Sequence, residues 1–472
     1  MSWLRYLNLT LLRRARVAVA FVVIAASLMT FWVRHQEKKS AIEAATGAAD
    51  TEPSTRSAQL ARLPQIPTAA FVPEFDPRVV LEDRENRIRE EFKIETISPG
   101  LEDRVGFWLK IYSRYDSNKK VIHHADFPWI IYKVVDVEPI VNASHPKRRW
   151  QRNQVAERIV SREAKLVREA LKLVAVRGEN ARSEDPEMQR EIPQIIESLR
   201  ALPGDLRRQA QRAAQEVRVQ TGQRDFFAEG LARAPRYWPT MEEIFAKHRL
   251  PLELTRLPLV ESSFNKEAHS KVGAVGVWQF MENTGRKFLT VTAEVDERKS
   301  VFKSSEAAAR LMKENYMILG RSWPFALTAW NHGPGGVRKA SQVARSRDFA
   351  TVIERYQSRR FDFASTNFFP CFLAALYAER YSDRLFPDVV RMEQAIVKPI
   401  KVPRPTAVTE IIKVAGLSME EFISINPEFE KIALRKGKLP RGLIIHVPSD
   451  ARSAVEAFMY SQGSERLTAA ND

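Results

Sequence analysis

The segment Arg249–Asn265 reads RLPLELTRLPLVESSFN, and it carries the first sign of chemistry in the chain. Pro251 suits the first turn of a helix, because the amide hydrogen that proline lacks has no partner there. Leucines recur behind it at helical spacing, and Leu257 precedes Glu261 by four residues on the same face. The pattern predicts a lone carboxylate on an apolar helix face near the end of that helix.

Two interpretations of Glu261 are open from this helix alone. Its carboxylate can form a structural ion pair with a nearby arginine such as Arg256. Alternatively, desolvation raises the pKa of the carboxyl, which is what a general acid for sugar chemistry needs. Pro258 is expected to kink the helix, which blurs the projection of its side chains. The segments that follow favour the second interpretation.

Two glycine-containing segments lie downstream of this helix. Residues 269–288 read HSKVGAVGVWQFMENTGRKF, where the first two glycines allow close backbone approach or a positive φ. Residues 325–340 read FALTAWNHGPGGVRKA, which predicts an apolar helix face that ends at Trp330 and Asn331 before a glycine-rich turn. The spacing to lysine is wrong for a phosphate-binding loop, so a nucleotide site is not predicted.

Three blocks of these segments resemble the signature blocks of the soluble-lytic-transglycosylase domain. They are ESSFN at 261–265, GAVGVWQFM at 273–281 and AWNHG at 329–333. The layout resembles that of membrane-bound lytic murein transglycosylases of the D type, in which such a domain precedes LysM modules. The resemblance implies a mainly α protein, with a lysozyme-like α+β catalytic domain at 225–390, a helical N-terminal region and a small α+β LysM-like C-terminal module.

The resemblance also implies a reaction in which Glu261 is the single catalytic acid. Its carboxyl would protonate the oxygen of the β-1,4 bond between N-acetylmuramic acid and N-acetylglucosamine. As a carboxylate, it would then take the proton of the muramoyl C6 hydroxyl while that oxygen attacks C1. The product is a 1,6-anhydro ring and no water is consumed, so the second carboxylate that an ordinary glycosidase needs is not required.

Five substrate-binding residues follow from the same resemblance. Ser270 would form a hydrogen bond near the reacting muramoyl unit, Gln279 and Met281 would line the groove, and Asn331 would hold the sugar or the catalytic loop. Trp330 stands where the family usually has tyrosine, and an indole only donates a hydrogen bond whereas a phenol also accepts one. No metal and no cofactor is implied.

Two other functions remain open at this point. A muramidase would hydrolyse the same bond, but it needs a positioned water and a second carboxylate. The acidic residues close by in sequence, Glu253, Glu267 and Glu282, are interpreted as surface charges. A non-catalytic wall-binding or scaffolding protein would explain Trp330 as the mark of a decayed site, although the presence of Glu261 with the other blocks argues against decay.

The N-terminal part predicts export and attachment to a membrane. Residues 17–33 read VAVAFVVIAASLMTFWV, an uncharged helix of about 25 Å if it is continuous. We expect a single-pass anchor in the inner (cytoplasmic) membrane, with the basic residues 1–16 in the cytoplasm and the catalytic part in the periplasm. A cleavable signal peptide is the alternative. Residues 34–75 are expected to be a flexible linker.

Residues 76–224 are expected to be a helical region of unknown role. Within it, residues 121–140 read VIHHADFPWIIYKVVDVEPI, which predicts a strand or hairpin. His123 and His124 have no partner ligands at a metal-binding spacing, so they are expected at the strand surface. Cys371 lies in an apolar helix and is expected to be buried.

The C-terminal part, residues 398–450, resembles a degenerate LysM-like module and is followed by a tail at 451–472. The order of its elements is expected to be strand, helix, Asn-Pro turn and strand. The Gly-Asp-Thr that such modules usually carry is replaced by Arg404-Pro405-Thr406. A small appendage that packs on the catalytic domain is therefore an equal alternative to a glycan-binding module.

The composition agrees with a folded, exported protein. The chain has 472 residues, of which 44% are hydrophobic and 28% charged, and its single cysteine excludes an intrachain disulfide framework. The net charge of +16 points to an anionic partner. The resemblance implies peptidoglycan glycan strands as the partner. Nucleic acid is not expected, because the basic residues are interleaved with acidic ones in an exported chain.

Overall fold

The structure is a computed structural model that describes residues 100–142 and 149–461, and these residues form two compact units. Each unit is made of separate stretches of the chain. The first contains residues 229–313 and 388–461, and the second contains residues 100–228 and 314–387. The stretch expected to form one catalytic domain, 225–390, is therefore divided between the units.

The second unit contains a three-stranded antiparallel sheet with the order β2-β1-β3. Its strands are β1 (Lys119–His124), β2 (Ile131–Asp136) and β3 (Val217–Thr221). β1 and β2 form the hairpin that the β-branched sequence predicts, with Val121 opposite Val134. The central strand, β1, also pairs with β3, which lies almost a hundred residues later in the chain, and Val121 is opposite Gln220 in this pair.

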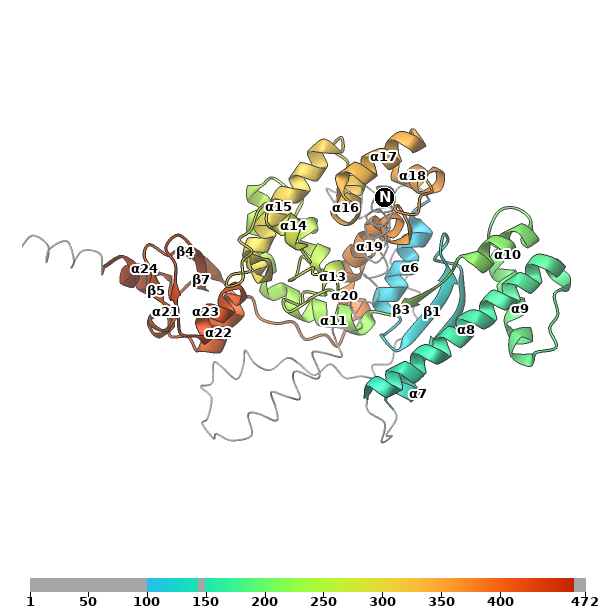
Figure 1. The fold of residues 1–472 in the computed structure, drawn as a ribbon, viewed down its shortest axis with the longest axis horizontal. Helices are drawn as coiled ribbons and strands as arrows, with labels where there is room; N and C mark the ends of the chain where they lie inside the picture. The colour runs from blue at the N-terminus through green and yellow to red at the C-terminus, as the bar shows by residue number, and fades with distance from the viewer. Residues whose placement is uncertain (1–99, 143–148, 462–472) are drawn as a thin grey trace, which may run out of the picture. The chain divides into compact units, whose positions relative to one another are not determined.

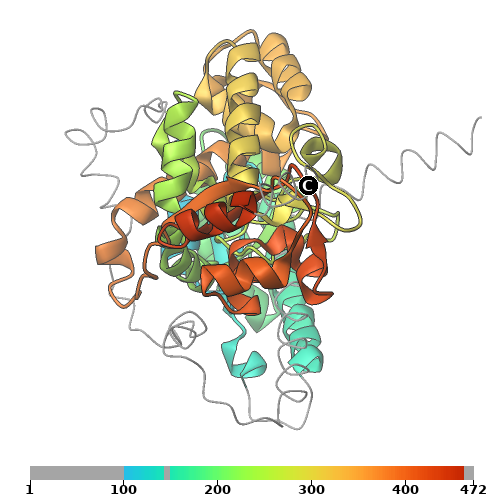
Figure 2. The same cartoon turned by 90° about the vertical axis from the view of Figure 1, so that its left-hand side faces the viewer.

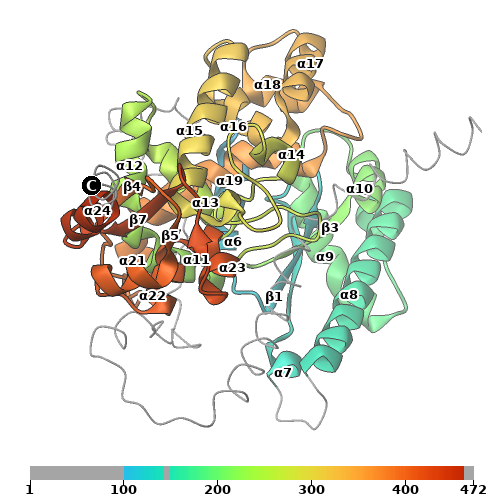
Figure 3. The same cartoon turned by 60° about the vertical axis from the view of Figure 1, so that its left-hand side comes forward.

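Three helices build an apolar core with this sheet. They are α8 (Arg149–Arg177), α9 (Pro186–Arg200) and α10 (Leu206–Gln215), and α8 lies against β2 and β3 (Figures 1 and 3). Val167, Leu171 and Val174 follow the helical repeat of α8 and are fully buried in that core. Asp185 and Asp205 cap α9 and α10 by accepting hydrogen bonds from backbone N–H groups of the first turn.

Other helices of the second unit pack against α19 (Phe363–Arg380). α6 (Glu102–Ser113) packs along α19, and the Trp108 indole donates a hydrogen bond to Asn367 Oδ1 at 3.0 Å. Cys371 of α19 is buried, as predicted. The remaining helices are α7 (Glu138–Val141), η1 (Gly178–Asn180), α16 (Trp323–His332), α17 (Pro334–Ala344), α18 (Phe349–Arg355) and α20 (Ser382–Leu385).

The prediction that His123 and His124 lie at the strand surface is wrong, because both side chains are fully buried. α6 and α19 contribute Phe107 and Phe363, whose rings lie 4.9 Å and 5.5 Å from the His123 ring. Burial lowers the pKa of His123 to about 3 and that of His124 to about 4. The sequence could not reveal this, since α19, one of the two helices that cover the strand, is distant along the chain.

The first unit begins with short helices joined by long loops. They are α12 (Trp238–Lys247), η3 (Leu252–Arg256), α13 (Leu257–Glu261), α14 (Glu282–Gly285) and η4 (Glu297–Lys299). Before them, α11 (Arg224–Arg233) and η2 (Ala234–Arg236) lead the chain into this unit, and α15 (Val301–Ile318) leads it out again.

The C-terminal part of the first unit is a small α+β module, which we name the C-terminal module (residues 397–461; Figure 2). Two antiparallel pairs of strands hold it together: β4 (Val397–Lys401) with β7 (Ile444–Pro448), and β5 (Thr406–Ala407) with β6 (Lys438–Leu439). Its helices are α21 (Val408–Ala415), α22 (Met419–Ile425), η5 (Pro427–Phe429), α23 (Glu430–Leu434) and α24 (Arg452–Ser461).

The prediction of a mainly α fold is confirmed by these elements. No helix among residues 100–142 and 149–461 is both long and apolar enough to cross a membrane. The predicted anchor at 17–33 and the predicted linker at 34–75 lie outside the described residues.

Candidate active site

Glu261 is the last residue of α13, which follows η3 in a helix that is broken rather than continuous. Pro258 lies in the first turn of α13, where its missing N–H costs nothing, so it begins a new helix instead of kinking one. Leu257 and Leu259 are buried, while Glu261 is only half-buried. The apolar face expected from the sequence therefore anchors the helix and leaves its last side chain partly accessible.

The backbone turns sharply directly after Glu261. The N–H groups of Ser262 and Phe264 both donate to the carbonyl oxygen of Pro258, at 3.0 Å and 3.2 Å. Ser263 and Phe264 have φ angles of 51° and 53°, in the left-handed region that residues with a Cβ rarely occupy. The Phe264 side chain is 1% exposed, so packing holds this unfavourable backbone in place.

The side chain of Ser262 connects this turn to the next segment of the site. Its hydroxyl donates a hydrogen bond to the carbonyl oxygen of Val277 at 2.8 Å, and Ser262 itself is buried. Gly230 provides the space behind the turn, because a Cβ there would lie 3.1 Å from Leu259 and 3.2 Å from Ser263. The residue next to Glu261 is thus fixed to the glycine-containing segment.

That segment, residues 268–281, is a compact loop closed by its own backbone. Gly276 has a φ of 77° and donates its N–H to Ala268 at 2.9 Å, and a Cβ on it would lie 2.0 Å from the carbonyl oxygen of Arg298. Gln279 also has a positive φ, 48°, and its side-chain amide donates to the carbonyl oxygens of Gly276 and Ala268 at 2.8 Å and 3.2 Å. The Gln279 side chain therefore braces the loop.

Ser270 and Met281 lie near the two ends of this loop. The Ser270 hydroxyl accepts a hydrogen bond from the backbone N–H of Ala274 at 2.8 Å, which closes the turn at residues 270–274. The Met281 side chain is 42% exposed, which is unusual for a large apolar residue beside a buried loop. Trp278 between them is fully buried, and its indole donates to Ser305 Oγ at 2.8 Å.

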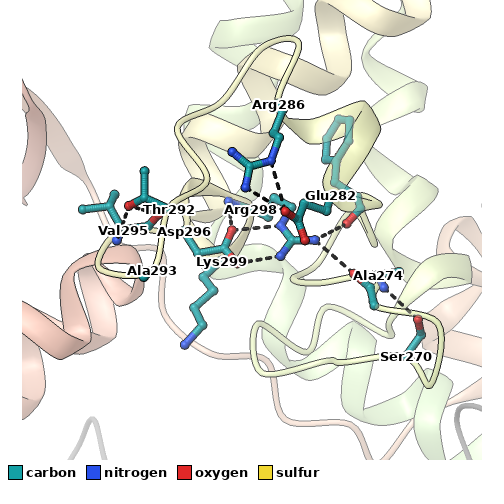
Figure 4. A network of polar contacts seen from close by, with 12 residues as sticks. Ser270, Ala274, Glu282, Arg286, Thr292, Ala293, Val295, Asp296, Arg298 and Lys299 are labelled. Carbon is teal, nitrogen blue, oxygen red and sulfur yellow. Dashed lines mark hydrogen bonds and ion pairs between the residues drawn. The ribbon is translucent and has the colours of Figure 1, made fainter.

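Arg298 and Asp296 hold the loop from outside (Figure 4). The guanidinium of Arg298, which is 6% exposed, donates from Nε and Nη2 to the two Asp296 oxygens at 2.9 Å and 2.7 Å. Its Nη1 donates to the carbonyl oxygens of Gly273 and Phe280 at 3.0 Å and 3.2 Å. Only the planar fork of an arginine matches this set of acceptors.

No pattern in the sequence predicts this Arg298–Asp296 clamp. An Asp two residues before an Arg gives no signal of its own, because the same pair is common on solvated surfaces. Its importance depends on the burial of both side chains against a loop that lies about twenty residues earlier.

The other charged residues near Glu261 are engaged in local contacts. Arg256 forms an ion pair with Glu242, and its guanidinium lies 4.4 Å from the ring centroid of Trp238. Glu267 and Glu282 are exposed, as predicted. Within the described ranges, no group of three or more His, Cys, Asp or Glu side chains could hold a metal ion.

Trp330 and Asn331 lie in the second unit, near the end of α16. Gly333 follows with a φ of 83° and begins the turn into α17, as the sequence predicts. Asn331 Oδ1 is buried and accepts no hydrogen bond from any residue that the structure describes, so it is an acceptor without a protein donor. His332 beside it lies 2.8 Å from Ser365 Oγ through Nδ1, and burial lowers its pKa.

The predicted site residues therefore fall into two groups. Four of them, Glu261, Ser270, Gln279 and Met281, lie in the first unit, where Ser262 and the loop bonds connect their segments. The other two, Trp330 and Asn331, belong to the second unit.

Comparison with known proteins gives a family match over this part of the chain. Residues 242–353 match the family described as the transglycosylase SLT domain, and this stretch contains all six predicted site residues. The chain is also 28% identical over 185 residues to membrane-bound lytic murein transglycosylase D of Escherichia coli strain K12. It is equally similar to the protein of that name from strain O6:H1.

These matches cover a limited share of the proteins compared. The aligned residues make up 38% of this chain, and the chain spans about 40% of the length of the curated relatives that it matches. The resemblance found in the three sequence blocks is confirmed by the family match, which includes all of them. The chain carries a transglycosylase SLT domain and is similar in sequence to the membrane-bound lytic murein transglycosylases of the D type.

Proposed function

We propose that this protein is a peptidoglycan lytic transglycosylase that cleaves the β-1,4 bond between N-acetylmuramic acid and N-acetylglucosamine and leaves 1,6-anhydro ends. One observation carries the proposal: Glu261, within a matched SLT domain, ends a short helix directly before a strained and tightly packed turn. Backbone strain held by packing is common at active sites, where it fixes a reacting group in one position.

The reaction needs one group that first donates and then accepts a proton. The Glu261 carboxyl protonates the glycosidic oxygen, and the bond from C1 to that oxygen breaks. The resulting carboxylate takes the proton of the muramoyl C6 hydroxyl, whose oxygen forms the new bond to C1. Glu261 is protonated again at the end, so the step is balanced without water or a second carboxylate.

The five other predicted residues fit roles in binding the glycan. Asn331 Oδ1 offers a buried acceptor that a sugar hydroxyl or amide N–H can fill. The exposed Met281 side chain suits an apolar sugar face, and Trp330 adds an aromatic ring from α16. Ser270 and Gln279 already hold the loop, so we assign them the additional task of keeping the groove wall in shape.

We also propose that residues 17–33 anchor the protein in the inner membrane with its catalytic part in the periplasm. The proposal rests on the uncharged sequence of that segment and on the basic residues before it. The Escherichia coli relatives carry the description membrane-bound in their name, which agrees with it. Residues 34–75 would then let the catalytic part reach the wall.

Mass spectrometry of the muropeptides that the full chain releases from purified sacculi tests the proposed reaction. We expect anhydro-muropeptides from the wild type and a loss of at least about 10²-fold from Glu261→Gln, since a general acid contributes this much or more. Glu267→Gln is the matched control, because Glu267 is exposed and six residues away. Products with reducing ends would identify a muramidase instead. Retained binding to sacculi without any release would identify a wall-binding protein.

A further inference from the structure

The C-terminal module has an apolar core that also includes a residue of the preceding part of the first unit. Phe422, Phe429 and Val447 are fully buried within the module. Val295, from the segment that carries the Arg298–Asp296 clamp, packs into the same core. The module and this segment therefore share buried apolar surface, which a module on a flexible tether would not do.

A buried ion pair joins the two parts beside this shared core. Lys303 Nζ lies 3.0 Å from Glu428 Oε1, and the Glu428 side chain is fully buried. The Lys303 ammonium also lies 4.4 Å from the ring centroid of Phe429. Burial raises the pKa of Glu428 and the Lys303 charge opposes that rise. Lys303 Nζ also lies 3.0 Å from Glu297 Oε1. Removing Lys303 would leave the Glu428 carboxylate buried and uncompensated, so this contact specifies how the module docks.

Further polar contacts surround the buried pair. They are the ion pairs of Lys299 with Glu430 at 3.1 Å and of Arg435 with Glu294 at 3.0 Å, and the hydrogen bond from Lys431 Nζ to the carbonyl oxygen of Ala293 at 2.6 Å. Each of them ends on residues 293–303, the segment that contains Arg298. The module therefore supports the element from which the clamp reaches Gly273 and Phe280.

A second contact reaches the loop of Glu261 directly. Lys266, five residues after Glu261, donates from Nζ to Ser424 Oγ at 3.1 Å and to the Ser424 carbonyl oxygen at 3.2 Å. Burial lowers the pKa of Lys266. The module thus contacts both segments that define the position of Glu261.

We infer that the C-terminal module acts as a docked brace, which positions the Glu261 turn through Lys266 and the 268–281 loop through residues 293–303. Lys266 and the Lys303–Glu428 pair are positioning residues, since they act on the site through other residues. This inference rests on the proposed function where it concerns turnover. It assigns the module a task inside the catalytic unit, in addition to any affinity for glycan.

Lys266→Met tests the brace with little risk to folding, because it keeps the apolar stem and removes only the ammonium. Amide hydrogen exchange of the full chain is expected to become several-fold faster in residues 262–270. Turnover of glycan strands is expected to fall about tenfold in kcat, with KM little changed, because a small displacement of Glu261 affects the reacting geometry more than binding. Lys266→Arg is expected to restore both.

Lys271→Met is the matched control, since Lys271 is exposed on the same loop, and it should change neither quantity. Exchange and kcat that stay at wild-type values in Lys266→Met would overturn the brace. A wild type that releases no anhydro product would overturn the proposed function alone, because the exchange measurement decides the brace without any activity.

The buried pair gives a second test that does not depend on Lys266. Glu428→Gln keeps the shape of the side chain and removes its charge, and it is expected to speed exchange in residues 293–303 as well as in η5. The double variant Lys303→Met with Glu428→Gln should exchange more slowly than Lys303→Met alone, because the fully buried carboxylate of Glu428 is no longer left without a counter-charge. Changes confined to the module would contradict the inference.

Discussion

The loop around Glu261 and the core beneath α8 are held together by different forces. The loop, residues 262–281, depends on individual hydrogen bonds, positive φ angles and the Arg298–Asp296 clamp. The core of the second unit depends on apolar side chains that repeat along regular helices and strands. Directional hydrogen bonds in the loop fix the positions of individual atoms. Apolar packing in the core requires only that the side chains fill the available volume, because it has no preferred direction.

This difference predicts which substitutions each region tolerates. A volume-conserving exchange in the apolar core should cost little, because packing has no preferred direction. A substitution of similar volume in the loop should lower the free energy of unfolding far more when it removes a hydrogen-bond donor that several carbonyl oxygens share. The following experiments compare the two regions, beginning with the substitution of largest expected effect.

Arg298→Met is expected to lower the free energy of unfolding of the first unit by about 4 kcal/mol, as for other charges that lose a buried partner. The Asp296 carboxylate, 21% exposed, would lose its bidentate donor, and Gly273 and Phe280 would lose theirs. Denaturant unfolding followed by fluorescence measures this. Arg286→Met is the control, because Arg286 is 54% exposed and its ion pair with Glu282 should contribute less than about 1 kcal/mol. If both variants lost the same free energy of unfolding, the Arg298–Asp296 clamp would contribute no more than the exposed Arg286–Glu282 pair.

Leu171→Ala is expected to lower the free energy of unfolding of the second unit by about 3 kcal/mol, because it leaves a cavity in a fully buried position. The turnover of the folded protein should stay unchanged, in contrast to Arg298→Met. Val176→Ala on the same helix, at a position 72% exposed, should have almost no effect. A large loss of kcat in folded Leu171→Ala would show that the two regions are not independent.

Acid is expected to destabilise the second unit through its buried histidines. The folded pKa of His123 is lowered to about 3, so its neutral form stabilises the fold above the unfolded pKa, and this stability is lost as the pH falls. Between pH 6.5 and pH 5 the loss should be about 2 kcal/mol for this residue. Unfolding measured at pH 7 and pH 5 tests it, and His123→Leu should show a smaller difference between the two. An unchanged difference would mean that other groups carry the acid sensitivity.

Ser262→Ala is expected to have the smallest effect on stability, about 1 kcal/mol, since it removes one neutral hydrogen bond to Val277. Its effect on kcat should nevertheless exceed that of Leu171→Ala, because Ser262 is adjacent to Glu261. Ser161→Ala, an exposed hydroxyl on α8, should alter neither quantity. A kcat equal to that of the wild type would show that this bond is not needed to position the carboxylate.

The sequence was informative wherever a local pattern determines the structure. The β-branched run after residue 120 predicted the hairpin of β1 and β2. The glycine that ends α16 was also readable, since a helix ends where the backbone needs a positive φ. The three blocks around Glu261 led to the SLT domain, and the family match agrees.

Contacts between distant segments could not be read from the sequence. The burial of His123 depends in part on α19, which is close in space but far along the chain. Arg298 and Lys266 look like ordinary surface charges until the loop and the module that accept their hydrogen bonds are in place. The division of residues 225–390 between two units likewise has no local signal, because it arises from which stretches pack together.

The interleaving of the two units along the chain has a consequence for the order of biosynthesis. Residues 229–313 leave the ribosome before residues 388–461, with which they form one unit. At about 5–20 residues per second, the intervening stretch delays completion of that unit by about 4–15 s. A chain that terminates early, before residue 388, keeps Glu297 beside Lys303 but lacks Glu428, and it lacks the module core into which Val295 packs. Unfinished chains therefore expose apolar surface that the complete unit buries.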